Sequence, residues 1–95
     1  MSDVFEVQLS RQAEKDLQKV PNYIKEKLNL WIELVELLGL VRVREIKGYH
    51  DEPLLGFRLG QRSIRLNKSY RAFYIRQADK SVEFIEVTEV NKHEY

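Results

Sequence analysis

The stretch from Pro21 to Leu38 constrains the fold most, because it predicts one long helix. Its apolar side chains recur at helical spacing, at Ile24, Leu28, Trp31, Ile32, Val35 and Leu38. Leu30, Leu34 and Leu37 widen this apolar arc. A helix with so wide an arc is expected to pack on more than one neighbour, or to offer an exposed part to a partner protein. Trp31 is expected in the core, with a stacking role as the alternative, and Gly39 fits a C-terminal cap.

The chain before this helix predicts a strand and a shorter helix. In Val4–Leu9, apolar side chains alternate so that Phe5, Val7 and Leu9 share one face, which is typical of a half-buried strand. Ser10 follows where an N-cap belongs, since its hydroxyl can accept a free backbone N–H of the next turn. A helix is therefore expected over Arg11–Val20, and Pro21 ends it.

The chain after Gly39 changes from helical to strand periodicity. Leu40–Lys47 is expected to be one helical turn or an irregular link, and Gly48–Pro53 a loop. Up to four strands follow, over Leu55–Leu59, Arg62–Leu66, Tyr70–Gln77 and Ser81–Val90. The order β-α-α-β-β-β(-β) predicts a single α+β domain over residues 1–95. Its mostly antiparallel sheet should carry a helical hairpin on one face and leave the other face open for a ligand.

The composition points to a soluble cytoplasmic protein without a metal. There is no cysteine, so neither a disulfide nor a thiolate site is expected. No apolar run approaches the roughly 20 residues of a membrane helix, and residues 1–4 lack the pattern of a signal peptide. The two histidines lie far apart in the sequence and make a poor ligand set, so we expect neither a metal nor a small-molecule cofactor.

The charge is ordinary in sum but uneven along the chain. The net charge is +1, yet residues 40–76 hold nine Lys/Arg and three Asp/Glu, a net of +6. The remainder holds seven bases and twelve acids, a net of −5. Such polarity favours a phosphate-rich partner, and the alternative is that the charges follow exposed faces by chance.

The basic side chains of this half lie on the predicted strands and turns: Arg58, Arg62, Arg65, Lys68, Arg71 and Arg76. Arginine binds phosphate with two parallel hydrogen bonds, and the interleaved aromatic residues can stack on bases. If Ile64 and Leu66 face the helices, Arg65 faces away and Arg62 does not. Alternation does not decide the face of Arg71, because Tyr70–Ile75 is apolar on both sides. The alternative is a solvated sheet face whose aromatic rings belong to the core.

Groups that can transfer a proton flank the basic segment. Glu52 precedes it, His93 and Tyr95 follow it, and His50 and Lys92 complete the polar set expected to touch RNA. A carboxylate can take the proton of a ribose 2′-hydroxyl, and an imidazole can give one to a leaving oxygen. With Arg65 and Arg71 to stabilise the phosphate, these are the parts of an RNA-cleaving site. The alternative for Glu52 is a structural ion pair.

Several stretches resemble the RelE/ParE toxin superfamily of bacterial type II toxin–antitoxin systems. They are the helical hairpin, Gly56-Phe57-Arg58-Leu59, Ser69-Tyr70-Arg71-Ala72-Phe73-Tyr74 and the ending Asn91-Lys92-His93-Glu94-Tyr95. Asp51-Glu52-Pro53-Leu54 is similar to a loop of YoeB-like ribosome-dependent mRNA interferases. The resemblance implies Glu52 as general base, Arg65 and Arg71 at the scissile phosphate, and either His93 or Tyr95 as general acid.

The resemblance also implies partners. They are the ribosome with its mRNA, and a separate antitoxin protein that blocks the basic site. Two alternatives share the fold: a ParE-like inhibitor of DNA gyrase, and a non-catalytic module that binds RNA or protein.

Overall fold

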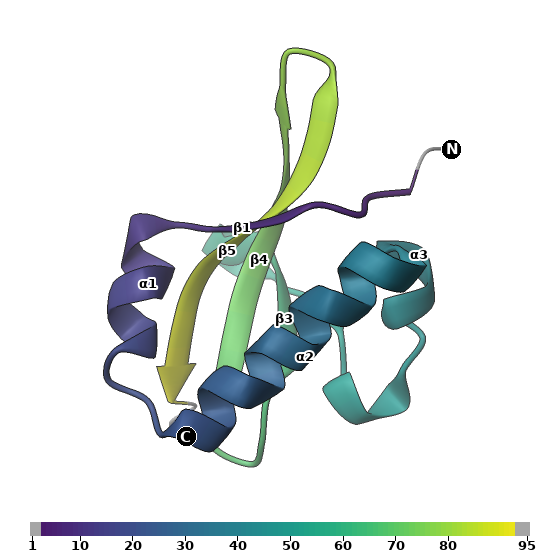
Figure 1. Cartoon of the computed structure of the whole chain (residues 1–95). Coiled ribbons are helices and arrows are strands. Elements are labelled where there is room, and N and C mark those ends of the chain that lie inside the picture. The colour runs from purple at the N-terminus through teal and green to yellow at the C-terminus, as the bar shows by residue number, and fades with distance from the viewer. Residues whose placement is uncertain (1–2, 93–95) are drawn as a thin grey trace.

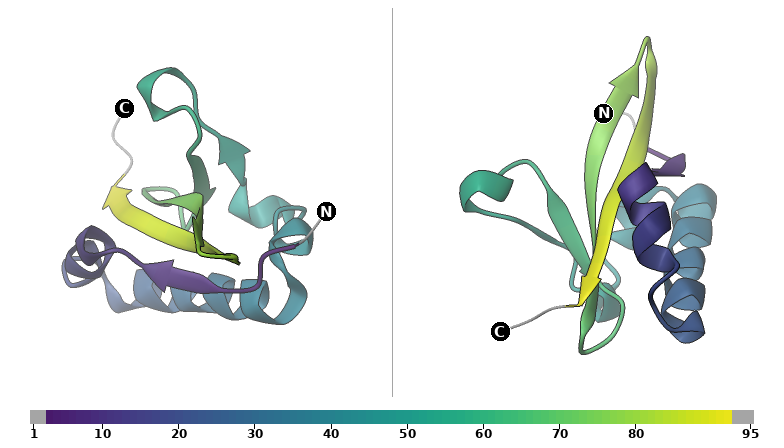
Figure 2. Two further views of the ribbon diagram at one scale, coloured as in Figure 1. Left: turned by 90° about the horizontal axis from the view of Figure 1, so that it is seen from above. Right: turned by 90° about the vertical axis from the view of Figure 1, so that its left-hand side faces the viewer.

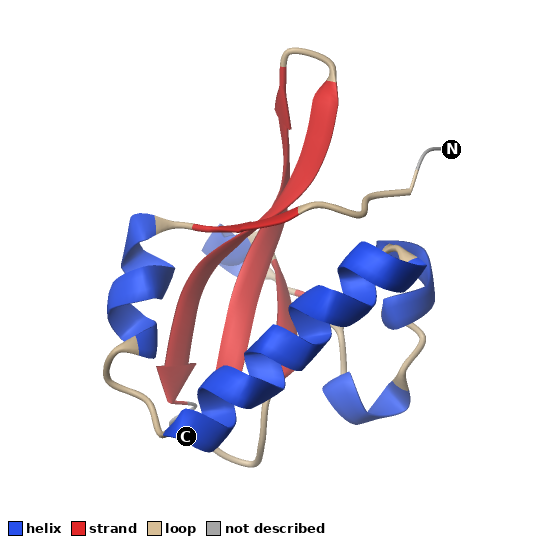
Figure 3. Cartoon of the chain, in the orientation of Figure 1, coloured by secondary structure: helices blue, strands red, loops and turns tan. Residues whose placement is uncertain are grey.

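The computed structural model describes residues 3–92 (Figure 1). Figure 3 colours the helices blue and the strands red. The elements are β1 (Val7–Leu9), α1 (Arg11–Leu17), α2 (Asn22–Leu38), α3 (Leu40–Val43), η1 (Lys47–Tyr49), β2 (Glu52–Pro53), η2 (Gly56–Arg58), β3 (Arg62–Arg65), β4 (Tyr70–Asp79) and β5 (Val82–Lys92).

The five strands form one sheet in the order β1-β5-β4-β3-β2. β1 runs parallel to β5, and the other neighbours are antiparallel. The helices α1 and α2 cover one face of the sheet, as the edge-on view in Figure 2 shows. The predicted α+β class, the order of elements and the mostly antiparallel sheet are therefore confirmed.

The core lies between α2 and the sheet. The side chains of Ile24, Leu28, Trp31 and Val35 are fully buried, and their spacing of four, three and four residues puts them on one side of the helix. The Trp31 ring lies 5.3 Å from that of Tyr74 on β4, measured between centroids. The predicted core position of Trp31 is thus confirmed. Burying each such side chain contributes about 1.5–3 kcal/mol relative to leaving it exposed.

The expected N-terminal strand begins later than predicted. It starts at Val7, and in the segment before it Val4 is buried whereas Phe5 is 49% exposed. The reason is a contact with the start of α3, because the Val4 carbonyl accepts the Leu40 N–H at 2.9 Å. Ser10 is the N-cap of α1 as predicted, its Oγ accepting the Ala13 N–H at 3.0 Å.

The expected strand at Leu55–Leu59 is wrong. Residues 54–61 form an arm, closed at its base by the Leu54 N–H donating to the Gln61 carbonyl at 3.0 Å. This arm projects from the sheet face opposite the helices (Figure 2). Gly56 and Gly60 adopt positive φ, 68° and 97°, which turns the chain out of an extended path. The apolar side chains that suggested a strand are therefore largely exposed, at Leu55, Phe57 and Leu59.

Candidate functional site

Two arginines face each other across the open face of the sheet. The register pairs Arg65 on β3 with Arg71 on β4, and their neighbours Ile64 and Ala72 are buried on the helix side. Since side chains alternate along a strand, Arg65 and Arg71 both point away from the helices. Pairing across the two strands, which alternation alone could not reveal, thus decides the face of Arg71.

Glu52 lies beside Arg71 through the next strand pair. β2 and β3 pair Glu52 with Ser63. The Arg71 Nη1 donates to the Ser63 Oγ at 3.2 Å and to the Glu52 Oε1 at 3.4 Å. The Glu52 side chain is 57% exposed, so its ion pair is weak and its carboxylate is accessible. The ion pair fits both interpretations of Glu52, as a general base and as a structural ion-pair partner.

His50, two residues before Glu52, lies beside Arg65. The His50 Nε2 lies 3.4 Å from the Arg65 Nη1. The His50 backbone has φ 46°, a left-handed conformation that residues other than glycine rarely adopt. The Arg65 Nε also donates to the Asn67 carbonyl at 3.4 Å. One cluster therefore contains His50, Glu52, Arg65 and Arg71. Ser63 belongs to it as well, through its hydrogen bond with Arg71, and was not predicted from the sequence. No sequence pattern marks Ser63 as a site residue, because its position in the site comes from its pairing with Glu52 and Phe73 across the sheet.

Arg62 lies on the other side of β3. Its Nε donates to the Asp51 Oδ1 at 2.6 Å, and the Asp51 side chain is fully buried. Burial lowers the pKa of Arg62, but the hydrogen bond and charge of Asp51 outweigh it and raise that pKa. Arg62 also lines a hollow of about 380 Å³ with Val41, Arg44 and Glu45. It is thus not part of the Arg65–Arg71 cluster.

Asp51 also accepts a hydrogen bond from Tyr74. The Tyr74 Oη lies 2.5 Å from the Asp51 Oδ2. Burial, then the hydrogen bond and charge of Asp51, raise the pKa of Tyr74 far above its ordinary value. Tyr74 therefore stays a neutral hydrogen-bond donor at any physiological pH. The role of Asp51 in connecting Arg62 with Tyr74 was not predicted from the sequence.

The other expected RNA contacts lie around the cluster. Arg58, on the arm, is bonded to Glu89 at 3.1 Å and its guanidinium lies 4.5 Å from the Phe73 ring centre. Lys68 is exposed in the turn before β4, where the Asn67 Oδ1 accepts two backbone N–H groups. Lys92 is exposed at the end of β5 and pairs in register with Tyr70. The predictions for His93 and Tyr95 lie outside the described residues.

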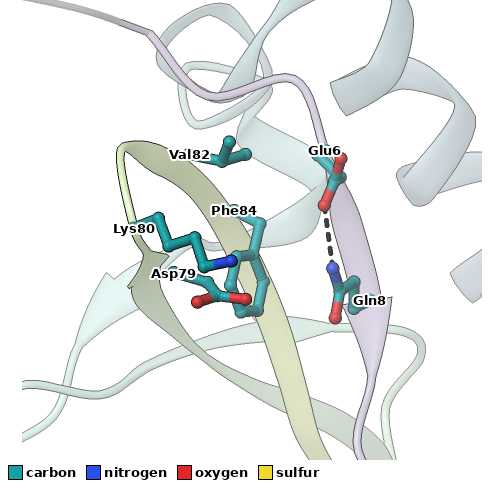
Figure 4. Close-up of a pocket in the computed structure, with 6 residues that line it drawn as sticks. All are labelled: Glu6, Gln8, Asp79, Lys80, Val82 and Phe84. Atoms are coloured by element: carbon teal, nitrogen blue, oxygen red, sulfur yellow. Dashed lines mark hydrogen bonds between the residues drawn. The ribbon is translucent and has the colours of Figure 1, made fainter.

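A second hollow lies far from this cluster. It has a volume of about 300 Å³ and lies where β1 meets the β4–β5 hairpin tip (Figure 4). The side chains of Glu6 and Gln8 are hydrogen-bonded at 2.8 Å on its rim. Asp79 on its wall is eight residues along β4 from Arg71, or about 26 Å of extended strand. This hollow is not part of the Glu52–Arg71 site.

Within residues 3–92, no three His, Cys, Asp or Glu side chains are grouped closely enough to hold a metal ion. In the same residues, no helix is both long and apolar enough to span a membrane.

The chain has the fold of several bacterial toxins. It superposes on a YoeB/ParE toxin from Agrobacterium tumefaciens with a TM-score of 0.70 and 21% identity, covering 94% of this chain and 99% of that one. YafQ from Escherichia coli gives a TM-score of 0.70 and 17% identity, over 93% and 92% of the two chains. A chain of the toxin–antitoxin complex RelBE2 from Mycobacterium tuberculosis gives 0.63 and 20%, over 95% and 99%.

These comparisons confirm the predicted resemblance at the level of the fold over nearly the whole chain. No protein-family model and no curated protein matches the sequence. The similarity is therefore carried by the arrangement of helices and strands rather than by close sequence identity.

Proposed function

We propose that this protein is the toxin of a type II toxin–antitoxin system and a ribosome-dependent endoribonuclease that cuts mRNA. The observation that carries the proposal is the cluster of Glu52, Arg65 and Arg71 on the open sheet face. A carboxylate and two guanidinium groups beside an accessible surface supply the general base and the phosphate-binding groups for cleavage by 2′-hydroxyl attack.

In this mechanism Glu52 is the general base. Its carboxylate takes the 2′-hydroxyl proton, and the 2′-oxygen attacks the adjacent phosphorus. The bond from phosphorus to the 5′-oxygen breaks, leaving a 2′,3′-cyclic phosphate on one fragment. The 5′-oxygen of the other fragment leaves with a proton, which the resemblance assigns to His93 or Tyr95. The protonated Glu52 then returns its proton to water, and the general acid takes a proton back from water.

Arg65 and Arg71 are the proposed phosphate-binding groups. They face each other across β3 and β4, so a phosphate between them would meet both guanidinium groups. Arg71 is already oriented by Ser63 and Glu52, and Arg65 by the Asn67 carbonyl. Donors held in place before the charge develops stabilise a transition state more than mobile ones do. Arg58, Lys68, Lys92 and His50 are proposed as surrounding RNA contacts.

The proposed partners follow from this surface and from the fold. A ribosome presents mRNA in single-stranded form, and the basic half of the chain suits contact with ribosomal RNA. The matched Mycobacterium tuberculosis chain comes from a toxin–antitoxin complex, which supports an antitoxin as a second partner. Action on translating ribosomes would make the site of action cytoplasmic.

The test is primer extension on mRNA translated in a cell-free system. Wild type, Glu52→Gln and Arg71→Ala are compared with Lys15→Ala, a control that removes an exposed charge from α1. We expect discrete cleavage by wild type and Lys15→Ala. We expect a loss of about 100-fold or more in Glu52→Gln, since general base catalysis contributes roughly 10²–10⁴-fold. Cleavage by wild type that is unchanged in both site variants would refute the assigned residues.

A second candidate is inhibition of DNA gyrase, because the matched Agrobacterium tumefaciens protein is described as a YoeB/ParE toxin. A gyrase inhibitor would cause cleaved DNA complexes to accumulate in a supercoiling assay while transcripts stay intact. A protein that does neither would be a non-catalytic binding module of the same fold.

A further inference from the structure

The segment that carries Glu52 alternates between buried and exposed side chains. Tyr49 is 5% exposed and the Asp51 side chain is fully buried, whereas His50 and Glu52 are exposed. The two exposed groups are the ones that reach Arg65 and Arg71. The two buried groups therefore hold this segment from beneath.

Asp51 has two strong partners inside the molecule. Arg62 donates to one carboxylate oxygen at 2.6 Å and Tyr74 to the other at 2.5 Å. Hydrogen bonds to an ionised carboxylate are shorter and about twice as strong as those between neutral groups. Because both oxygens are occupied, rotation of the Asp51 side chain would break at least one of these bonds, and the backbone at Asp51 is held accordingly.

These partners connect the segment to the longest helix. The Tyr74 ring packs against Trp31 of α2. Tyr49 also contacts this helix, since the Lys27 ammonium lies 5.7 Å from the centre of the Tyr49 ring. Movement of the segment would therefore have to disturb side chains that are packed on α2.

The backbone around Glu52 has little other support. β2 is two residues long and pairs with β3 alone. One of its two residues is Pro53, which has no N–H to give to a neighbouring strand. Residues 54–61 then leave the sheet as the arm. Side-chain contacts at Asp51 must replace the hydrogen bonds that a longer strand would supply.

We propose that Asp51, held by Arg62 and Tyr74, is a positioning residue that sets the Glu52 carboxylate against Arg71 and the reacting 2′-hydroxyl. This inference rests on the proposed function and deepens it, since it assigns Arg62 to the support of the site rather than to RNA. Asp51 touches no substrate and acts through Glu52. A displacement of about 1 Å in a catalytic group can reduce a rate by roughly 100-fold.

The test uses Tyr74→Phe and Asp51→Asn. Tyr74→Phe keeps the ring against Trp31 and removes only the hydroxyl, so it is expected to fold even if Asp51→Asn does not. Single-turnover cleavage on programmed ribosomes should fall by about 10–100-fold in Tyr74→Phe, while the KM for the ribosome–mRNA complex changes less than about 3-fold. Val35→Ala, a buried truncation on α2, controls for lost stability and should cleave at the wild-type rate at a temperature where it is folded.

A double-mutant cycle with Glu52→Gln distinguishes positioning from general damage. If Asp51 and Tyr74 act through Glu52, adding Tyr74→Phe to Glu52→Gln should lower the residual rate by less than about 2-fold. Independent multiplication of the two losses, or a wild-type rate in Tyr74→Phe, overturns this inference and leaves the proposed function standing. A wild-type protein that cleaves no mRNA overturns the proposed function and this inference with it.

Discussion

Gly39 is the residue whose replacement by alanine the structure predicts to be most informative about stability. It joins α2 to α3 with φ 88° and ψ 153°, a conformation that residues with a side chain rarely adopt. A Cβ built there would lie 2.2 Å from the Asp3 Oδ2 and 3.0 Å from the Phe5 Cζ. Gly39→Ala must therefore both strain the backbone and displace Asp3.

The loss in the free energy of unfolding caused by Gly39→Ala has two parts. A residue held in such a backbone region costs about 1–3 kcal/mol. The Asp3 Oδ1 accepts the N–H groups of Val4 at 2.8 Å and of Val41 at 3.0 Å, and displacing Asp3 loses both bonds. At about 0.5–1.5 kcal/mol for each bond, with the exposed one at the low end, the total loss is about 2–5 kcal/mol.

Urea unfolding monitored by the fluorescence of Trp31, the sole tryptophan, measures this loss. Gly48→Ala is the matched control, because a Cβ there meets nothing within 4 Å and its φ is not positive. That control should leave the free energy of unfolding unchanged or raise it by about 0.4–1 kcal/mol. In an Asp3→Ala background, Gly39→Ala should lower the free energy of unfolding by the backbone strain alone, because the Asp3 hydrogen bonds are already absent. A Gly39→Ala protein within about 0.5 kcal/mol of wild type would refute the reasoning.

Three further predictions concern a cap, a pair of tyrosines and the basic face. Ser10→Ala should lower the free energy of unfolding by about 1 kcal/mol in the same assay, because its Oγ caps α1 and donates to the Thr88 carbonyl at 2.8 Å. Burial raises the pKa of Tyr49, and burial with Asp51 raises that of Tyr74, so the folded state retains protons that the unfolded chain releases near pH 10. The contribution of these two tyrosines to the free energy of unfolding should thus be constant below about pH 10 and fall above it, and a fall above pH 10 as steep in Tyr74→Phe as in wild type would count against this. Arg71→Ala should reduce the slope of log affinity against log salt by about 0.7 for a 2′-O-methyl RNA strand measured by fluorescence anisotropy, whereas an unchanged slope would argue against a phosphate contact.

The sequence alone determined several of the local elements. The spacing of Ile24, Leu28, Trp31 and Val35 predicted the buried side of α2, because helical periodicity is a property of neighbouring residues. Ser10 was identified as a cap for the same reason, since its hydroxyl bonds a backbone group three residues on. Alternation also put Arg65 opposite Ile64. The same alternation misled at Leu55–Leu59, where two glycines with positive φ produced an arm instead of a strand.

Only the tertiary structure decided how these elements meet. The face of Arg71 came from its pairing with Arg65, and the contact of Arg71 with Glu52 spans 19 residues of sequence. The buried contact of Asp51 with Tyr74 spans 23. Such contacts depend on strand register and on which side chains lose water together, and neither quantity is encoded in the periodicity of a single segment. The long helix that constrained the fold from the start thus also contacts, through Trp31, the tyrosine that donates a hydrogen bond to Asp51 beside the candidate site.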